Sequence, residues 1–256
     1  MIRRNGCIGI IGIASLAMTI SAQALAQDTA HKMNEMREHM QDHHGGQVFW
    51  YVEGERLEYR SNEGDPVFLW DAQGWLGGDI NRLWLKTEGE FDFDAEEFED
   101  AEVQALWSRT ISDYFDLQAG VRHDFAPGGD RTFGVVGAQG LLPYLFEIDA
   151  AMFISDDGDV EARIETEYEL LITQRLILQP RAELNFAAQD IPEYGVGAGL
   201  SDIETGARLR YEITRQFAPY VGVSWERAVG GAADFARADG EDPRSVSFIA
   251  GVRTWF

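Results

Sequence analysis

Long segments in which apolar and polar side chains alternate residue by residue constrain the fold of this chain most strongly. From Val160 to Leu170, uncharged side chains at the even positions alternate with charged side chains at the odd positions. Residues 81–91, 176–186 and 201–212 repeat the alternation. A period of two over such lengths is typical of β-strands that have one apolar and one polar face.

The polar faces of these segments are long and carry both signs of charge. A soluble β-sandwich would also alternate, but its strands average ~5–6 residues, whereas a strand that crosses hydrocarbon at a tilt needs ~9–11. A closed barrel leaves no backbone edge unsatisfied in lipid, and it places a polar lumen inside an apolar outer face. We therefore predict an all-β fold, a transmembrane antiparallel outer-membrane β-barrel.

Twelve strands are expected in residues 48–256, and ten strands is the alternative. The second and sixth strands have the weakest patterns. Residues 230–244 are polar and contain glycine, so they are expected to form the long exposed loop. The expected strands are 48–60, 65–75, 79–92, 97–110, 112–125, 131–141, 144–155, 159–172, 175–187, 199–212, 216–227 and 245–256.

The last of these strands carries a further signal. Its apolar side chains alternate from Val246 onward, and the chain stops on Phe256. A terminal aromatic residue that closes an alternating strand is what outer-membrane barrels present to their assembly machinery. The end of the sequence therefore favours the same fold as the alternation.

Residues 1–26 have the order of a secretory signal peptide. Arg3 and Arg4 precede the apolar run Ile8–Ile20, and the small-residue stretch Ala22–Ala26 follows it. The apolar run of 13 residues is shorter than the ~20 that a spanning helix needs, which disfavours the alternative of a membrane anchor. Cleavage is expected after Ala26, with Ala24 as the second choice. Since Cys7 would be lost, the mature chain could form no disulfide and no thiolate metal site.

The charge of the mature chain bears on its partners. Without Arg3 and Arg4, 19 Lys and Arg residues face 44 Asp and Glu residues, a net charge of about −25. Nucleic-acid binding needs a basic footprint, so no nucleic-acid partner is expected. An acidic surface attracts cations, although the acidity alternatively serves only solubility.

Residues 27–47 form a Met/His-rich segment, which Gly45 and Gly46 join flexibly to the barrel. Thioether sulfur suits Cu(I), and imidazole also suits Cu(II), zinc and nickel. The segment is expected to be short and disordered or helical, since steps of three and four would align its ligands on one face of a transient helix. A packed amphipathic helix and a tail without ligands are the alternatives. The predicted copper ligands are His31, Met33, Met36, His39, Met40, His43 and His44.

Acidic residues on the inward strand faces are a second candidate site. They either guide a cation through the lumen or pair with inward bases and fill it. Inward Trp84 and Tyr220 would help to plug a barrel of this size. The acidic candidates are Glu88, Glu90, Glu161, Glu165, Glu167 and Asp149, and the candidate bases are Arg82, Lys86, Arg163, Arg181 and Arg208.

The sequence does not favour an enzyme. His123 is the one histidine outside the Met/His-rich segment, and Asp124 follows it directly. A histidine beside a carboxylate resembles a general base with its orienting group, but neighbours in a strand point to opposite faces. We therefore expect no catalytic activity.

A long motif suggests a family. The run from Trp75 to Glu90, Trp-Leu-Gly-Gly-Asp-Ile-Asn-Arg-Leu-Trp-Leu-Lys-Thr-Glu-Gly-Glu, resembles the copper resistance protein B family (CopB), as do Glu53-Gly54, Leu57–Arg60 and the Met/His-rich segment. The resemblance implies an outer-membrane protein of a copper resistance or homeostasis system. We expect the barrel to be a monomer. It also implies a periplasmic multicopper oxidase as partner.

The resemblance further implies copper sequestration or export. We expect the Met/His-rich segment to lie in the periplasm. Many relatives carry a longer Met/His region, and the ligand run here spans fourteen residues. Capture of few copper ions is therefore expected rather than storage of many. The alternatives are a docking partner of the oxidase without transport and a general small-solute channel.

Overall fold

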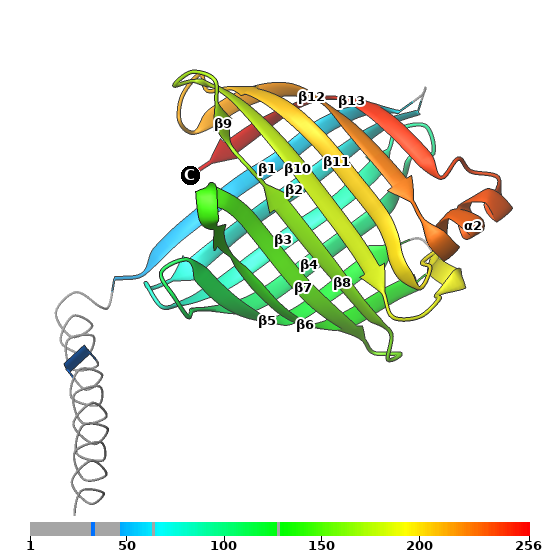
Figure 1. Cartoon of the computed structure of the whole chain (residues 1–256), viewed down its shortest axis with the longest axis horizontal. Helices are drawn as coiled ribbons and strands as arrows, with labels where there is room; N and C mark the ends of the chain where they lie inside the picture. The colour runs from blue at the N-terminus through cyan, green and yellow to red at the C-terminus, as the bar shows by residue number, and fades with distance from the viewer. Residues whose placement is uncertain (1–31, 34–46, 63–64, 127–128) are drawn as a thin grey trace, which may run out of the picture. The chain divides into compact units, whose positions relative to one another are not determined.

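Twelve antiparallel crossings close into one barrel within the compact unit Val48–Phe256 (Figure 1). The computed structural model describes residues 32–33, 47–62, 65–126 and 129–256. Strands β8 and β9 pair with the same neighbour, β10, and together make one crossing that is interrupted at Tyr168 and Glu169. The strands are β1 (Phe49–Asn62), β2 (Asp65–Gly77), β3 (Asn81–Asp92), β4 (Glu97–Thr110), β5 (Phe115–Ala126), β6 (Gly129–Leu142), β7 (Phe146–Ser155), β8 (Val160–Glu167), β9 (Leu170–Leu171), β10 (Leu176–Ala187), β11 (Gly199–Tyr211), β12 (Phe217–Ala228) and β13 (Arg244–Trp255).

The last strand closes the sheet on the first. Residues of β13 pair antiparallel with β1, for example Ala250 with Tyr59, and every other strand pairs with its neighbours in sequence. The prediction of a twelve-stranded antiparallel barrel is confirmed over the alternative of ten strands. The expected bounds differ from the observed ones by at most three residues.

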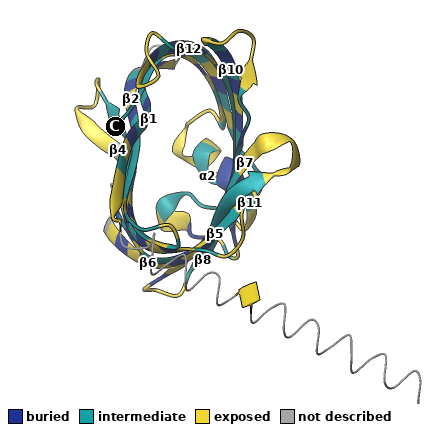
Figure 2. Cartoon of the chain, turned by 90° about the vertical axis from the view of Figure 1, so that its left-hand side faces the viewer, coloured by how far each residue is buried: buried dark blue, intermediate teal, exposed yellow. Residues whose placement is uncertain are grey.

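Burial varies from residue to residue along the strands of the barrel wall (Figure 2), as expected where alternate side chains point to opposite faces. On β3, Leu83 and Leu85 are exposed on the outer face, while Trp84 between them is buried on the inner face. On β12, Val221 and Val223 are exposed and Ser224 is buried. Exposed apolar side chains on the outer face suit contact with lipid hydrocarbon, and the polar inner face forms the lumen.

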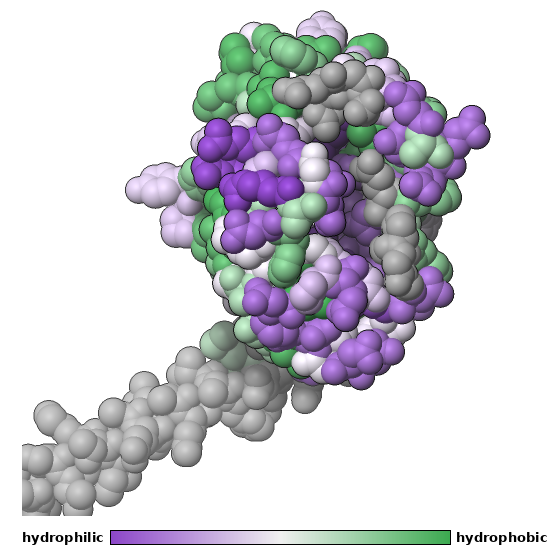
Figure 3. Space-filling view, turned by 90° about the vertical axis from the view of Figure 1, so that its right-hand side faces the viewer, coloured by the Kyte–Doolittle hydropathy of each residue, from purple (hydrophilic) through white to green (hydrophobic). Residues whose placement is uncertain are grey.

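The links differ at the two ends of the barrel. At the end where β1 begins and β13 finishes, here called the terminal end, the longest link is residues 212–216. At the opposite end, residues 188–198 include η2 (Pro192–Tyr194) and residues 229–243 include α2 (Gly230–Asp239). Figure 3 shows that hydrophilic residues gather at this opposite end and that hydrophobic residues begin at its sides.

Helix α2 corrects the prediction of a long exposed loop over residues 230–244. Its Ala232 and Ala233 are buried, and a Cβ on Gly197 would lie 2.2 Å from the backbone nitrogen of Ala232. The helix therefore packs against the link between β10 and β11, and it ends at Gly240, which adopts the left-handed conformation with φ of 90°. In the part of the chain that the structure describes, no helix is long and apolar enough to span a membrane.

The expected signal peptide, residues 1–26, lies outside the described residues. So does most of the Met/His-rich segment, of which Lys32, Met33 and Gln47 are described.

Candidate functional site

A bulge in β1 brings charged residues into the lumen. The pairing of β1 with β2 shifts between Gly54 and Arg56, which leaves Glu55 as the extra residue. A bulge turns successive side chains toward the same face. Glu55 accepts a hydrogen bond from Gln73 Nε2 at 3.2 Å, and Arg56 Nε donates to Asp71 Oδ2 at 2.9 Å. After the bulge, the even-numbered residues of β1 face inward.

Glu58 is the centre of the charge network on this side of the lumen. Its side chain has 0% exposure. Its carboxylate accepts hydrogen bonds from Arg208 Nε at 2.5 Å, from Tyr220 Oη at 3.1 Å and from Arg60 Nε at 3.1 Å. Since Arg208 lies on β11 and Tyr220 on β12, these contacts tie β1 to strands from the other end of the chain.

Arg181 on β10 joins several carboxylates. Its guanidinium contacts Glu165 at 2.8 Å, Glu183 at 2.5 Å and Glu204 at 3.4 Å. Glu204 also accepts a hydrogen bond from Arg60 Nη2 at 3.0 Å. Buried charges are tolerated where they are paired and hydrogen-bonded, so this side of the lumen is filled by salt-bridged side chains.

Arg163 on β8 reaches across the lumen to β3 and β4, and it also contacts the neighbouring strand β10. Nη1 donates to Glu88 at 3.0 Å, Nη2 donates to Glu102 at 3.1 Å, and Nε lies 3.5 Å from Glu183. The guanidinium carbon lies 5.8 Å from the ring centre of Phe153. One side chain therefore joins β8 and its neighbour β10 to β3 and β4 on the other side of the lumen.

The inward residues of β3 belong to the long motif recognised in the sequence. Arg82 donates to Asp116 Oδ2 at 2.9 Å and to the backbone carbonyls of Gly78 and Asp79, which braces the turn between β2 and β3. Lys86 Nζ donates to Asp149 Oδ2 at 2.6 Å. Asp149 lies on β7, four strands away, so this pair also crosses the lumen.

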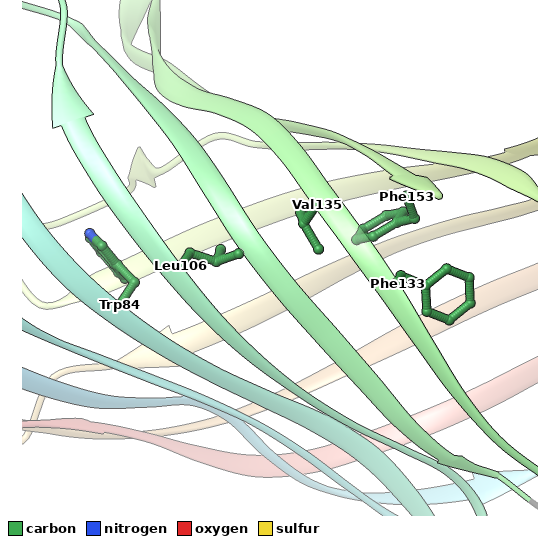
Figure 4. Close-up of a cluster of buried hydrophobic side chains, with 5 residues drawn as sticks. All are labelled: Trp84, Leu106, Phe133, Val135 and Phe153. Carbon is green, nitrogen blue, oxygen red and sulfur yellow. The ribbon is translucent and has the colours of Figure 1, made fainter. Parts of the chain in front are cut away.

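One stretch of the inner wall is apolar. Trp84, Leu106, Phe133, Val135 and Phe153 form a buried cluster on β3, β4, β6 and β7 (Figure 4). The inner wall therefore carries an apolar patch on these strands, beside salt-bridged residues of the same strands such as Lys86 and Glu102.

Two cavities lie within the lumen. One has a volume of about 410 Å³ and extends to Asp79, Ser112 and Tyr114 in the links of the terminal end. The other has a volume of about 300 Å³ and extends to Val196 and Ala232 at the opposite end. The residues that line both are Arg163 and Phe153.

Each acidic residue singled out in the lumen contacts a base. The structure therefore agrees with the interpretation that the acidic residues pair with inward bases and fill the lumen. Two of the expected bases have other partners, since Arg82 pairs with Asp116 and Arg208 pairs with Glu58. The pairs are Glu88 with Arg56 and Arg163, Glu90 with Arg60, Glu161 with Arg131, Glu165 and Glu167 with Arg181, and Asp149 with Lys86.

Several members of the network were missed in the sequence, notably Arg56, Glu58, Arg60, Glu102 and Glu204. A signal for Glu102 was available, because Glu102 and Gln104 alternate with apolar neighbours in residues 101–106. In β1 the bulge breaks the alternation, so the inward face could not be followed from one end of the strand to the other.

The structure describes one of the seven predicted copper ligands. Met33 is described, and with 53% exposure its side chain is accessible. His31, Met36, His39, Met40, His43 and His44 lie outside the described residues. Among the described residues, no group of three or more His, Cys, Asp or Glu side chains is arranged to hold a metal ion.

His123 and Asp124 do not form a pair in the structure. His123 Nδ1 lies 2.9 Å from Thr132 Oγ1, and the carboxylate of Asp124 accepts hydrogen bonds from Arg122 inside the barrel. The two side chains point to opposite faces of β5, as their neighbouring positions in a strand require.

Comparisons with known proteins agree on a family. A family model described as copper resistance protein B precursor matches residues 48–256. The chain is 46% identical over 213 residues to the copper resistance protein B homolog of Pseudomonas syringae pv. tomato, with 83% of this chain and 72% of that protein covered. It is 45% identical over 213 residues to copper resistance protein B of Escherichia coli, with 83% and 71% covered.

A solved structure resembles the barrel. The NanC porin structure aligns with a TM-score of 0.52 and 15% identity, and the alignment covers 80% of this chain and 99% of that chain. At this identity the likeness concerns the fold, an outer-membrane-type β-barrel, because one fold hosts many functions.

Proposed function

The chain belongs to the copper resistance protein B family, and from this premise we propose that it captures periplasmic copper at the outer membrane. Membership of the family implies a role in copper resistance. The proposal adds that the Met/His-rich segment binds the metal, that the barrel anchors this segment, and that bound copper is sequestered or passed on for export. No catalytic step is part of this role.

The chemistry of the segment supports copper as the ligand. Residues 31–44 contain four of the five histidines and three of the six methionines of the chain. Thioether sulfur favours Cu(I) and imidazole accepts Cu(II), so the set suits copper in either oxidation state. Methionine is what separates this set from one that would suit zinc.

The lengths of the links support an orientation. Outer-membrane barrels have short turns on the periplasmic side and longer loops outside. The links of 11 and 15 residues lie at the end opposite to the terminal end. We therefore place the terminal end, and with it the Met/His-rich segment, in the periplasm. Closure of β13 on β1 within one chain supports a monomer.

The observation that favours capture over a general small-solute channel is the salt-bridged filling of the lumen. Glu58, Arg181 and Arg208 are buried inside the barrel, and each contacts an opposite charge. Solutes that diffuse through a porin need a water-filled passage. A lumen occupied by paired side chains supports a protein that holds copper at its end rather than one that passes solutes freely.

A second candidate function is docking of a periplasmic multicopper oxidase without transport. The 3-10 turn η1 (Pro143–Leu145) at the terminal end exposes Tyr144 by 86% and Leu145 by 70%. Both residues have positive φ, 69° and 65°, and strain of this kind is found at sites of interaction. Changing both residues to serine would then reduce co-purification of the oxidase and leave copper binding intact.

Copper tolerance tests the proposed function. In cells that lack their own protein of this family, the natural chain is expected to restore growth on copper. A variant with Met33, Met36 and Met40 changed to leucine and the four histidines of residues 31–44 changed to asparagine is expected to lose this effect. Barrel assembly is checked by the heat-dependent shift of the folded band in gel electrophoresis.

A matched control changes other residues of the same segment. Asn34, Glu35, Glu38 and Gln41 are replaced by alanine, which alters the segment but keeps all seven predicted ligands. This variant is expected to protect cells as the natural chain does. Equal protection by the ligand variant would contradict copper capture by the segment.

A further inference from the structure

We propose that the lumen is a cation path closed by one partition, formed by Arg163 and Phe153. This inference goes beyond copper capture and does not depend on the ligands of the Met/His-rich segment. It concerns inorganic cations in general, and potassium is the probe.

The arrangement of the two cavities defines the partition. The larger cavity reaches the terminal end and the smaller one reaches the opposite end. Arg163 and Phe153 line both, so these two side chains lie where the two cavities adjoin. On the other side of the lumen, Glu58 and Arg208 are buried and form an ion pair with each other.

The contacts of Arg163 hold the partition across the lumen. Its guanidinium reaches Glu88 on β3, Glu102 on β4 and Glu183 on β10. The apolar neighbour Phe153 also contacts Arg122, whose guanidinium carbon lies 4.8 Å from its ring centre. The side chain of Arg163 therefore spans the lumen from β8 to β3 and β4 at this level.

If Arg163 is replaced, each carboxylate that it contacts still has another base as an ion-pair partner. Glu88 retains Arg56 as an ion-pair partner. Glu102 retains Arg122 at 2.8 Å, and Glu183 retains Arg181 at 2.5 Å. The loss of one base from a buried pair is costly mainly where it leaves a bare charge. The barrel is therefore expected to keep its fold when Arg163 is replaced.

The charge of the lining selects what would pass. Eleven carboxylates and three bases line the larger cavity, and three carboxylates and two bases line the smaller one. A passage lined mainly by one sign of charge concentrates ions of the opposite sign. Because Arg163 is one of the bases of both cavities, its removal both opens the path and makes its lining more acidic.

Single-channel conductance in planar lipid bilayers with potassium chloride tests the proposal. The Arg163→Ala variant is expected to conduct several-fold more than the natural protein. In a salt gradient its reversal potential is expected to shift toward the value for potassium. Arg131→Ala is the matched control, since Arg131 is a buried inward base with two ion pairs that lines neither cavity. This control is expected to conduct as the natural protein does.

Three results would overturn the proposal. Arg163→Ala could conduct no more than the natural protein, Arg131→Ala could open the barrel equally, or the open variant could select chloride. If Arg163→Ala does not fold, Phe153→Ala takes over the test, because it removes the other side of the partition without changing the charge. Unchanged conductance of folded Phe153→Ala would then contradict the partition.

Discussion

At the scale of single residues, the lumen depends on pairs that are distant in sequence. Glu58 and Arg208 are 150 positions apart, yet their side chains meet at 2.5 Å inside the barrel. Alternation along the chain predicts that Arg208 points inward, since every second residue faces the lumen. It does not predict the same for Glu58, because the bulge breaks the alternation of β1. It does not predict which inward charges meet, because the partner depends on strand register and on how far each side chain reaches across the lumen.

Arg181 is the residue at which a substitution should destabilise the barrel most clearly. Arg181→Ala would leave Glu165 without the one cation that it contacts directly, among the residues described. Removing one partner of a buried ion pair costs about 3–5 kcal/mol. The free energy of unfolding, measured by urea titration of tryptophan fluorescence in lipid vesicles, is expected to fall by this amount.

The control for Arg181 is an arginine whose ion pair is exposed. Arg237 on α2 contacts Asp234 at 2.8 Å, with side-chain exposures of 56% and 79%. Exposed pairs of this kind contribute about 0–1 kcal/mol, so Arg237→Ala should leave the unfolding midpoint almost unchanged. Equal losses in the two variants would mean that burial of the lumen pairs has no energetic weight.

At the scale of elements, the alternation of apolar and polar residues located the strands. The sequence did not predict the irregular positions within them, where the alternation or the pairing is interrupted. The expected strand 159–172 is split at Tyr168 and Glu169, and β1 contains the bulge at Glu55. A bulge adds one residue to one strand and not to its partner, so it becomes visible only once the pairing is known. Helix α2 was missed because its sequence was judged by polarity, although small residues such as Ala232 allow close packing.

The outer face of β12 offers a test of membrane contact. Val223 lies near the middle of this strand and is exposed on the outer face, whereas Phe217 lies on the same face at its terminal end. An arginine on the lipid side costs about 2–4 kcal/mol at the bilayer midplane and about 0–1 kcal/mol near the interface. Val223→Arg should therefore destabilise the barrel in lipid vesicles much more than Phe217→Arg.

The comparison between these two variants removes the general effect of adding arginine. If both variants lost the same stability, the outer face of β12 would not have the depth profile of a membrane-spanning strand. The readout is again the unfolding midpoint in urea, measured in vesicles of one lipid composition.

At the scale of the whole molecule, sequence and structure supply different parts of the account. The barrel followed from the alternation of residues such as those of 160–170, and the family followed from the motif of residues 75–90, which the comparisons confirm. Whether the lumen is filled could not be predicted, because it depends on side chains from almost every strand meeting at the barrel axis. The structure adds that inward residues of the motif, including Arg82 and Lys86, are members of the lumen network.

The barrel lumen and the Met/His-rich segment differ in what their side chains can bind. Each of the inward carboxylates that the sequence suggested as cation guides is engaged by a base, although carboxylates outnumber bases in the linings of the two cavities. The Met/His-rich segment carries the ligands with a preference for copper. We therefore assign copper capture to that segment, on a barrel whose own side chains fill much of its lumen.

Titration of copper tests this claim most directly. The mature protein, refolded in detergent, and a version without residues 31–44 are titrated with Cu(I) against a competing chelator, with zinc as the control metal. The account predicts tight Cu(I) binding by the mature protein, its loss in the shortened version, and weaker binding of zinc. Equal Cu(I) binding by the two versions would contradict it and would move the copper site into the barrel.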